Sequence, residues 1–139
     1  MFERCLYFNV NALARQVNTI WDEAFAEFDL SPAHAYLLRL VLAQPGIAQR
    51  DIALELKLAK STVTRFIDTL QTKGLLSRKK TADGDPREQN IFPTAKTLKI
   101  ADKLNNKGEE LYKKMLATLG THDMKTLVEM LRSATQHLG

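Results

Sequence analysis

Cysteine is nearly absent from this sequence, which has Cys5 as its single thiol among 139 residues. One thiol can neither form an internal disulfide nor provide a zinc site alone, so we expect the fold to rest on side-chain packing. The three histidines are scattered, and Gly84 is the lone glycine in its loop. Neither a metal-ligand cluster, nor a phosphate-binding glycine loop, nor a Ser-His-Asp set is indicated. The sequence therefore argues against an enzyme and predicts no cofactor and no metal.

Long hydrophobic runs are also missing. The most apolar stretch, Ala35 to Ala43, is nine residues long and contains Arg39, whereas a membrane span needs about 18 or more apolar residues. The first residues have mixed charge and no small-residue cleavage site, so they do not resemble a signal peptide. We therefore expect a cytoplasmic protein with no membrane partner.

Charge is present but unevenly placed. The net charge of +4 comes from 20 basic and 16 acidic residues, yet residues 57–80 carry seven basic residues against one acidic residue. Residues 1–56 have a net charge of −3, and the rest of the chain is close to neutral. A basic stretch of this kind is typical of a surface that meets phosphates.

Apolar residues recur at alternating spacings of three and four, which indicates amphipathic helices. One face extends from Leu6 to Ala24, over more than five turns. Ser31 and Pro32 then supply an N-cap and a proline at the first helical position, which predicts a second helix ending near Ala43. Further helical faces occur over 47–58, 63–70, 101–115 and 124–138.

The period changes after Gly74, a residue suited to the end of a helix. Two short segments, 75–80 and 89–92, flank a charged stretch that contains Asp-Gly and Asp-Pro pairs, which are typical of turns. This pattern predicts a β-hairpin with a long tip, the wing, and Pro93-Thr94 then opens the next helix. The expected fold is mainly α with a small β-wing, in the order of four helices, two strands and two helices.

Segment 49–68 fits a helix-turn-helix. With Ala53 as the small residue at the helix crossing, all five positions expected to be apolar are apolar: Ile52, Leu56, Leu58, Val63 and Phe66. Lys57 stands where this motif usually has glycine, so the turn must tolerate a bulky residue. A plain helical hairpin meets most of the same offsets, so the pattern alone leaves both interpretations open.

The neighbouring residues favour nucleic acid. The second helix of the motif opens with short hydroxyls and two cations, without an acid, as suits contacts to phosphates and to base edges in a major groove. The hairpin begins Arg78-Lys79-Lys80 and has Arg87 near its tip. The helices around this unit also have apolar faces longer than a small core can cover, which suggests a second copy of the chain.

Several stretches together resemble the MarR family of winged helix-turn-helix transcriptional regulators: Ser61 to Arg65, Asp68 to Arg78, the Asp-x-Arg of Asp85 and Arg87, and Pro93-Thr94, with Leu30 to Pro32 and the helix order also similar. The resemblance covers essentially the whole chain. Two residues depart from the family pattern at the start of the fifth helix, where Pro93 replaces the usual leucine and Thr97 the frequent glycine.

The resemblance implies a homodimer that binds double-stranded DNA, with a dimerisation helix in 1–29, a DNA-binding domain in 30–96 and dimerisation helices in 97–139. A two-fold dimer that reads successive grooves requires a pseudo-palindrome with half-sites roughly 10 base pairs apart. Arg87 is expected in a minor groove, oriented by Asp85, with Lys79 and Lys80 on the backbone. The residues expected at the major groove and its flanking phosphates are Lys60, Ser61, Thr62, Thr64 and Arg65.

The same resemblance offers two switches. A small aromatic or phenolic ligand would be lined by residues from Trp21, Phe25, His34 and Tyr36, although aromatic residues at helical spacing are more often core. Alternatively, Cys5 is placed similarly to the peroxide-sensing cysteine of one branch of the family, and oxidation of a thiol adds polarity to an interface. The tyrosines of that branch are replaced here by Asn9, Thr19 and His34, and a packed interface cysteine is the alternative. A winged-helix module that binds nucleic acid or protein without operator specificity is the remaining rival, because a fold does not fix its partner.

Overall fold

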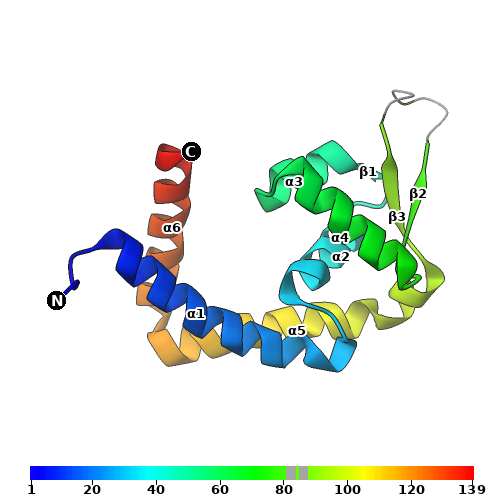
Figure 1. Ribbon diagram of the computed structural model, residues 1–139. Coiled ribbons are helices and arrows are strands. Elements are labelled where there is room, and N and C mark those ends of the chain that lie inside the picture. The colour runs from blue at the N-terminus through cyan, green and yellow to red at the C-terminus, as the bar shows by residue number, and fades with distance from the viewer. Residues whose placement is uncertain (81–83, 85–87) are drawn as a thin grey trace. The chain divides into compact units, whose positions relative to one another are not determined.

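The computed structural model of the protein describes residues 1–80, 84 and 88–139, and this part is mainly helical with one small sheet (Figure 1). The elements in chain order are α1 (Leu6–Phe25), the 3-10 helix η1 (Ala26–Phe28), α2 (Pro32–Ala43), β1 (Ile47–Ala48), α3 (Gln49–Leu56), α4 (Lys60–Thr72), β2 (Leu76–Lys79), β3 (Asn90–Pro93), α5 (Ala95–Leu119) and α6 (Thr121–Leu138). The expected fold class is confirmed, and the helices fall where the apolar spacing predicts them.

The chain divides into two compact units, Met1–Asn105 and Asn106–Gly139. The first unit holds α1 to α4, the sheet and the first part of α5, and the second holds the rest of α5 together with α6. The boundary therefore falls inside α5. The functional segments 1–29, 30–96 and 97–139 stay a prediction. Among the described helices, none combines the length and the hydropathy that a membrane span requires.

The sheet has one strand more than the sequence predicted. Its order is β1-β3-β2 and both pairings are antiparallel, with Ile47 opposite Ile91 and Leu76 opposite Pro93. Strand β1 is only two residues long, too short to show an alternating pattern, and it exists because β3 offers it a free edge. Pro93 ends β3, where its missing N–H costs no ladder hydrogen bond.

A continuous apolar core supports the helix-turn-helix within the first unit. The side chains of Leu37, Leu38, Ile52, Val63, Ile67, Leu70 and Ile91 are completely buried, and Ala53 at the crossing of α3 and α4 is 6% exposed. Burying a side chain of this size contributes roughly 1.5–3 kcal/mol each. The core leaves the opposite face of α4 free for solvent or a partner.

The turn between α3 and α4 spans three residues and contains Lys57 in the left-handed conformation, with φ 56° and ψ 45°. Its N–H donates to the carbonyl of Leu54, and the N–H of Leu58 donates to that of Ala53. The bulky residue is thus tolerated, but in a conformation that favours glycine.

Local capping chemistry fixes the ends of the other helices. The Ser31 hydroxyl accepts a hydrogen bond from the N–H of His34 at 3.2 Å, which confirms the predicted N-cap of α2. Gly74, at φ 74°, follows α4; its N–H donates to Gln71 O and that of Leu75 to Leu70 O, the two bonds of a Schellman motif. Gly120 separates α5 from α6, as predicted.

Two threonines, Thr94 and Thr97, fix the start of α5, and Thr97 stands where the family that the sequence resembles often has glycine. The Thr94 hydroxyl accepts from the N–H of Thr97 at 3.4 Å and donates to the carbonyl of Gly74 at 2.7 Å. Thr97 is completely buried, and its hydroxyl donates to the carbonyl of Leu75 at 2.5 Å. Helix α5 therefore begins one residue after Thr94 and is tied to the chain between α4 and β2.

Candidate nucleic-acid interface

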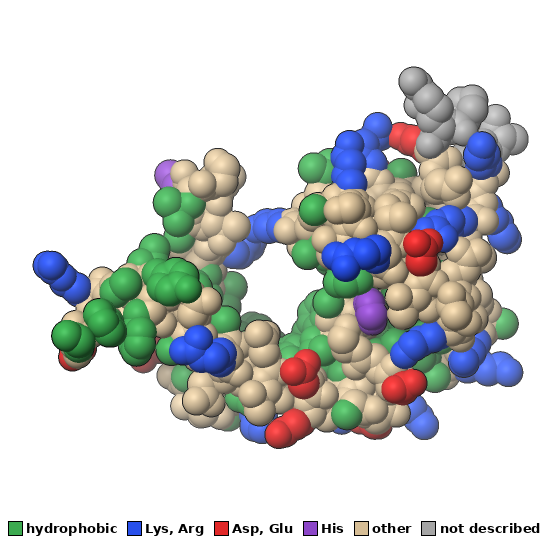
Figure 2. All heavy atoms as spheres, viewed as in Figure 1, with side chains coloured by type: hydrophobic (Ala, Val, Ile, Leu, Met, Phe, Trp, Pro, Cys, Tyr) green, Lys and Arg blue, Asp and Glu red, His purple; other side chains and the backbone are tan. Residues whose placement is uncertain are grey.

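Helix α4 presents the predicted groove residues on the side away from its core. Lys60, Ser61, Thr64 and Arg65 are exposed and Thr62 is half-buried, while Val63, Ile67 and Leu70 point into the core. The structure therefore brings the five predicted groove residues together on the first turns of one helix. Separate groups of Lys and Arg side chains lie over the region of α3, α4 and the wing, and others lie elsewhere on the visible face (Figure 2).

The N-terminus of α4 has no side-chain cap, because its N-cap residue is Ala59. The first amide N–H groups of a helix lack partners within the helix, and the helix dipole places partial positive charge there. No acidic residue occupies the first turn of α4. This end of the helix thus favours an anion such as a phosphate.

Thr64 is held by a residue that the sequence did not single out. The side-chain amide of Gln49, on α3, donates to the Thr64 hydroxyl at 2.6 Å, and that hydroxyl donates to the carbonyl of Lys60 at 3.0 Å. A hydroxyl has one donor and two acceptor sites, so Thr64 keeps one acceptor for a base or a phosphate group. A polar residue opening α3 is the only signal for Gln49 in the sequence.

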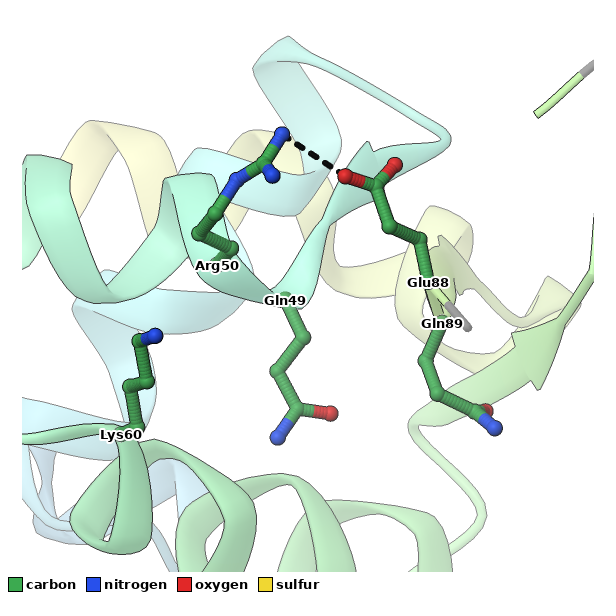
Figure 3. A pocket seen from close by; sticks show the side chains of 5 residues that line it. All are labelled: Gln49, Arg50, Lys60, Glu88 and Gln89. Carbon is green, nitrogen blue, oxygen red and sulfur yellow. Dashed lines mark ion pairs between the residues drawn. The ribbon is translucent and has the colours of Figure 1, made fainter. Parts of the chain in front are cut away.

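A hollow of about 230 Å³ lies beside the start of α4 and is lined by Gln49, Arg50, Lys60, Glu88 and Gln89. Figure 3 shows Arg50 and Glu88 pointing toward each other, and their ion pair measures 2.7 Å. Of these five residues, Lys60 alone was expected from the sequence. The others were missed because α3 and the base of the wing meet only after folding.

The basic residues of strand β2 divide into two kinds. The Arg78 guanidinium binds the Asp68 carboxylate at 2.5 Å and the Gln71 side chain at 2.5 Å, both on α4, so it links the wing to this helix. Lys79 is exposed and its ammonium lies 5.4 Å from the centre of the Phe92 ring; Lys80 is also exposed. The predicted wing residues Asp85 and Arg87 lie outside the described residues.

Three of the four predicted ligand residues form one cluster. The Trp21 indole N–H donates to the Tyr36 hydroxyl at 3.1 Å, and the completely buried Phe25 meets the Tyr36 ring edge-on at 5.9 Å. The Arg39 guanidinium lies 5.0 Å from the centre of the Tyr36 ring. The cluster joins α1 to α2, and sequence reasoning missed Arg39.

His34 lies apart from that cluster, with its ring edge-on to Phe66 of α4 at 4.6 Å. Burial lowers the pKa of His34 below its ordinary value of 6.5, and the positive charge of Lys73 lowers it further. The neutral imidazole is therefore favoured. The second hollow, about 360 Å³ and lined by residues 27–29 and by side chains from the end of α4 to α5, contains none of the four predicted ligand residues.

Cys5 occupies the N-cap position of α1 and is half-buried. The Asn9 amide, in a position where the redox branch would have tyrosine, donates to the backbone carbonyl of Cys5 at 2.8 Å. Its role as a redox switch stays a prediction. Among the described residues, no group of three or more His, Cys, Asp and Glu side chains converges as a metal site would require.

Comparison with known proteins supports the assignment of the helix-turn-helix and wing. Residues 28–88 match the MarR family. Over 134 residues the chain is 25% identical to the HTH-type transcriptional regulator YybA of Bacillus subtilis, covering 93% of this chain and 85% of that protein.

Solved structures share the fold along the whole chain. The MepR–DNA complex of S. aureus superposes with a TM-score of 0.84 at 21% identity, covering 99% of this chain and 100% of that one. PcaV of Streptomyces coelicolor, in complex with its natural ligand, gives a TM-score of 0.87 at 20% identity, over 100% and 97% of the two chains. Residues 28–88 therefore match the MarR family of transcriptional regulators, and the chain as a whole is similar in fold to solved winged helix-turn-helix structures.

Proposed function

We propose that the protein is a homodimeric repressor that binds a pseudo-palindromic operator in double-stranded DNA and leaves it when a small aromatic or phenolic ligand binds. The observation that carries the proposal is the exposed face of α4, where hydroxyls and cations surround an uncapped helix N-terminus. In a helix-turn-helix, the second helix enters the major groove with its N-terminal residues on base edges. Ser61, Thr62, Thr64 and Arg65 would read bases, with Lys60 on phosphate.

The wing supplies the flanking contacts in this proposal. Lys79 and Lys80 are exposed cations at the end of β2 and would meet the phosphate backbone. Arg87, with Asp85 to orient it, would enter a minor groove, as the family pattern implies. Phosphate contacts position a protein and base contacts specify the sequence, so the two groups of residues have separable effects.

The homodimer is supported by apolar surface at both ends of the chain. On α1, Leu6 is 60% exposed, and on α6, Met130 and Leu138 are 65% and 77% exposed. Large apolar side chains that recur exposed along a helix favour an interaction site on that helix. We assign residues 1–29 and 97–139 to dimerisation and 30–96 to DNA, and a cytoplasmic location accords with a DNA partner.

Ligand release is supported by the cluster of Trp21, Phe25 and Tyr36, which joins the dimerisation helix α1 to α2 of the DNA-binding segment. A planar aromatic molecule that displaced one of these rings would change the angle between the two segments. The bound ligand of the similar PcaV structure is consistent with such a site. Repression would follow from steric exclusion where the operator overlaps a promoter, since a bound dimer would cover that DNA.

The test is fluorescence anisotropy of labelled operator and random duplexes at several salt concentrations. Arg65→Ala should relax discrimination between the two duplexes, because each good base contact is worth about 1–3 kcal/mol. Arg87→Ala should weaken operator binding at least about tenfold while circular dichroism and the oligomeric state stay unchanged. Unaltered affinity of both variants contradicts the proposal, and equal affinity for all duplexes favours an unspecific winged-helix module instead.

A further inference from the structure

We propose that Glu88 occupies a phosphate site of the free protein, and that a backbone phosphate of bound DNA replaces its carboxylate on Arg50. This inference rests on the proposed DNA-binding function and assigns two residues, Arg50 and Glu88, that neither the sequence pattern nor the comparisons identify. It makes Glu88 an internal competitor of DNA at the edge of the recognition surface.

The ion pair of Arg50 and Glu88 lies beside the start of α4. Arg50 lies in the first turn of α3, and in a helix-turn-helix the first helix crosses the DNA backbone. Glu88 comes from the base of the wing, and Lys60 from the first turn of α4. All three line the hollow beside the groove-reading face of α4 (Figure 3).

The hollow is held open by backbone pairing. The N–H of Gln49 donates to the carbonyl of Gln89 at 3.0 Å, next to the pairing of Ala48 with Asn90 between β1 and β3. The start of α3 and the base of the wing are therefore fixed relative to each other. Arg50 and Glu88 meet across this fixed distance through flexible side chains that can separate without moving the backbone.

Once Glu88 has moved away, the charges at the hollow favour another anion in its place. Two cations, Arg50 and Lys60, and the uncapped start of α4 face two carboxylates, since Asp51 also lies 3.9 Å from Arg50. Glu88 satisfies Arg50 in the free protein, and its carboxylate has the planar oxygen pair that a guanidinium prefers. A phosphate offers the same pairing and releases counterions from DNA, so it is the stronger partner.

The exposure of the two side chains allows the exchange. The Arg50 side chain is 59% exposed and the Glu88 side chain 24% exposed, so the guanidinium remains accessible while Glu88 holds it. An ion pair exposed to this extent is weak and is screened by salt. Breaking the Arg50–Glu88 ion pair therefore costs little free energy compared with the gain from the phosphate contact.

The experiment measures binding of the full chain to an operator duplex and a random duplex, over a series of salt concentrations. Glu88→Gln should tighten binding to both duplexes about two- to fivefold, because Arg50 no longer has an internal partner. Arg50→Ala should weaken binding to both and reduce the slope of log affinity against log salt by about 0.9 per protomer. In the Arg50→Ala background, Glu88→Gln should change affinity less than about twofold.

Glu55→Gln is the matched control, since it removes one negative charge from an exposed position on α3, the helix that also carries Arg50. If Glu88→Gln has the same effect with and without Arg50, or no larger effect than Glu55→Gln, only net charge is involved and the inference is wrong. An unchanged salt slope in Arg50→Ala also overturns it. If the wild-type protein binds neither duplex, the proposed function fails as well. If the wild-type protein binds DNA but the variants do not behave as described, only the inference fails.

Discussion

At Lys57, the fold requires a backbone conformation that the residue type disfavours. The turn between α3 and α4 needs the left-handed conformation, and Lys57 adopts it at φ 56° although a side chain disfavours it by about 1–2 kcal/mol. The hydrogen bonds of Lys57 and Leu58 to the end of α3 hold the residue there. The position of this turn was predictable from Ala53, but its backbone conformation was not.

Lys57→Gly should raise the free energy of unfolding by about 0.5–1 kcal/mol, because relief of strain exceeds the flexibility that glycine adds to the unfolded chain. Urea denaturation followed by circular dichroism measures the change. Lys57→Ala is the control, since it removes the charge but keeps the Cβ atom. Equal stability of the two variants would contradict a backbone origin.

Whether the role of another residue could be predicted depends on how far along the sequence its partner lies. Ser31, Gly74 and Gly120 act on backbone groups a few positions away, so their roles follow from the local sequence. Gln49 and Thr97 act on residues 15 and 22 positions away, at Thr64 and Leu75. No local pattern contains those partners, so the site around Gln49 emerges only from the fold.

At the scale of elements, the side chain of Arg78 links the wing to helix α4. Arg78 of β2 binds both Asp68 and Gln71, which lie almost one turn apart on α4. Its side chain is 21% exposed, in contrast to the exposed Lys80 at the end of the same segment. The sequence grouped the three cations Arg78, Lys79 and Lys80, whereas the structure separates a linking residue from two accessible ones.

Arg78→Ala should leave the salt dependence of DNA binding unchanged, because its guanidinium is engaged within the protein. Lys80→Ala should reduce the salt slope by about 0.9 per protomer, as expected for a lost phosphate contact. Anisotropy titrations over a salt series compare the two variants. A reduced slope in Arg78→Ala would show that Arg78 contacts DNA, contrary to this account.

Stability gives an independent measure of the same link. A double-mutant cycle with Arg78→Ala and Asp68→Asn should give a coupling free energy of about 0.5–1 kcal/mol, since the pair is only partly exposed.

Strand β1 is an element that the sequence did not predict. Its two residues have no periodicity of their own, and only their pairing with Ile91 and Asn90 of β3 defines them as a strand.

At the scale of the whole molecule, apolar surface and charge are distributed to different parts of the chain. The surplus of basic residues lies in 57–80, which holds α4 and β2, and exposed apolar side chains recur on α1 and α6. This distribution accords with a protomer that uses one surface for nucleic acid and others for a second copy.

Leu131→Glu should convert the proposed dimer to a monomer, because Leu131 lies on the apolar side of α6 and is 38% exposed. Sedimentation velocity measures the mass, and circular dichroism checks that the helices remain. Leu54→Glu is the control, as Leu54 is 71% exposed on α3, outside the proposed dimerisation segments. If both variants form dimers, or if the wild-type protein is a monomer, this assignment is wrong.

The most direct test of the central claim is selection of bound sequences from a pool of random DNA duplexes by the full chain. The account predicts recovery of a pseudo-palindrome with half-site centres about 10 base pairs apart, since two copies of α4 enter successive major grooves on one side of the duplex. A pool with no enriched sequence, or with an unrepeated single site, would contradict it.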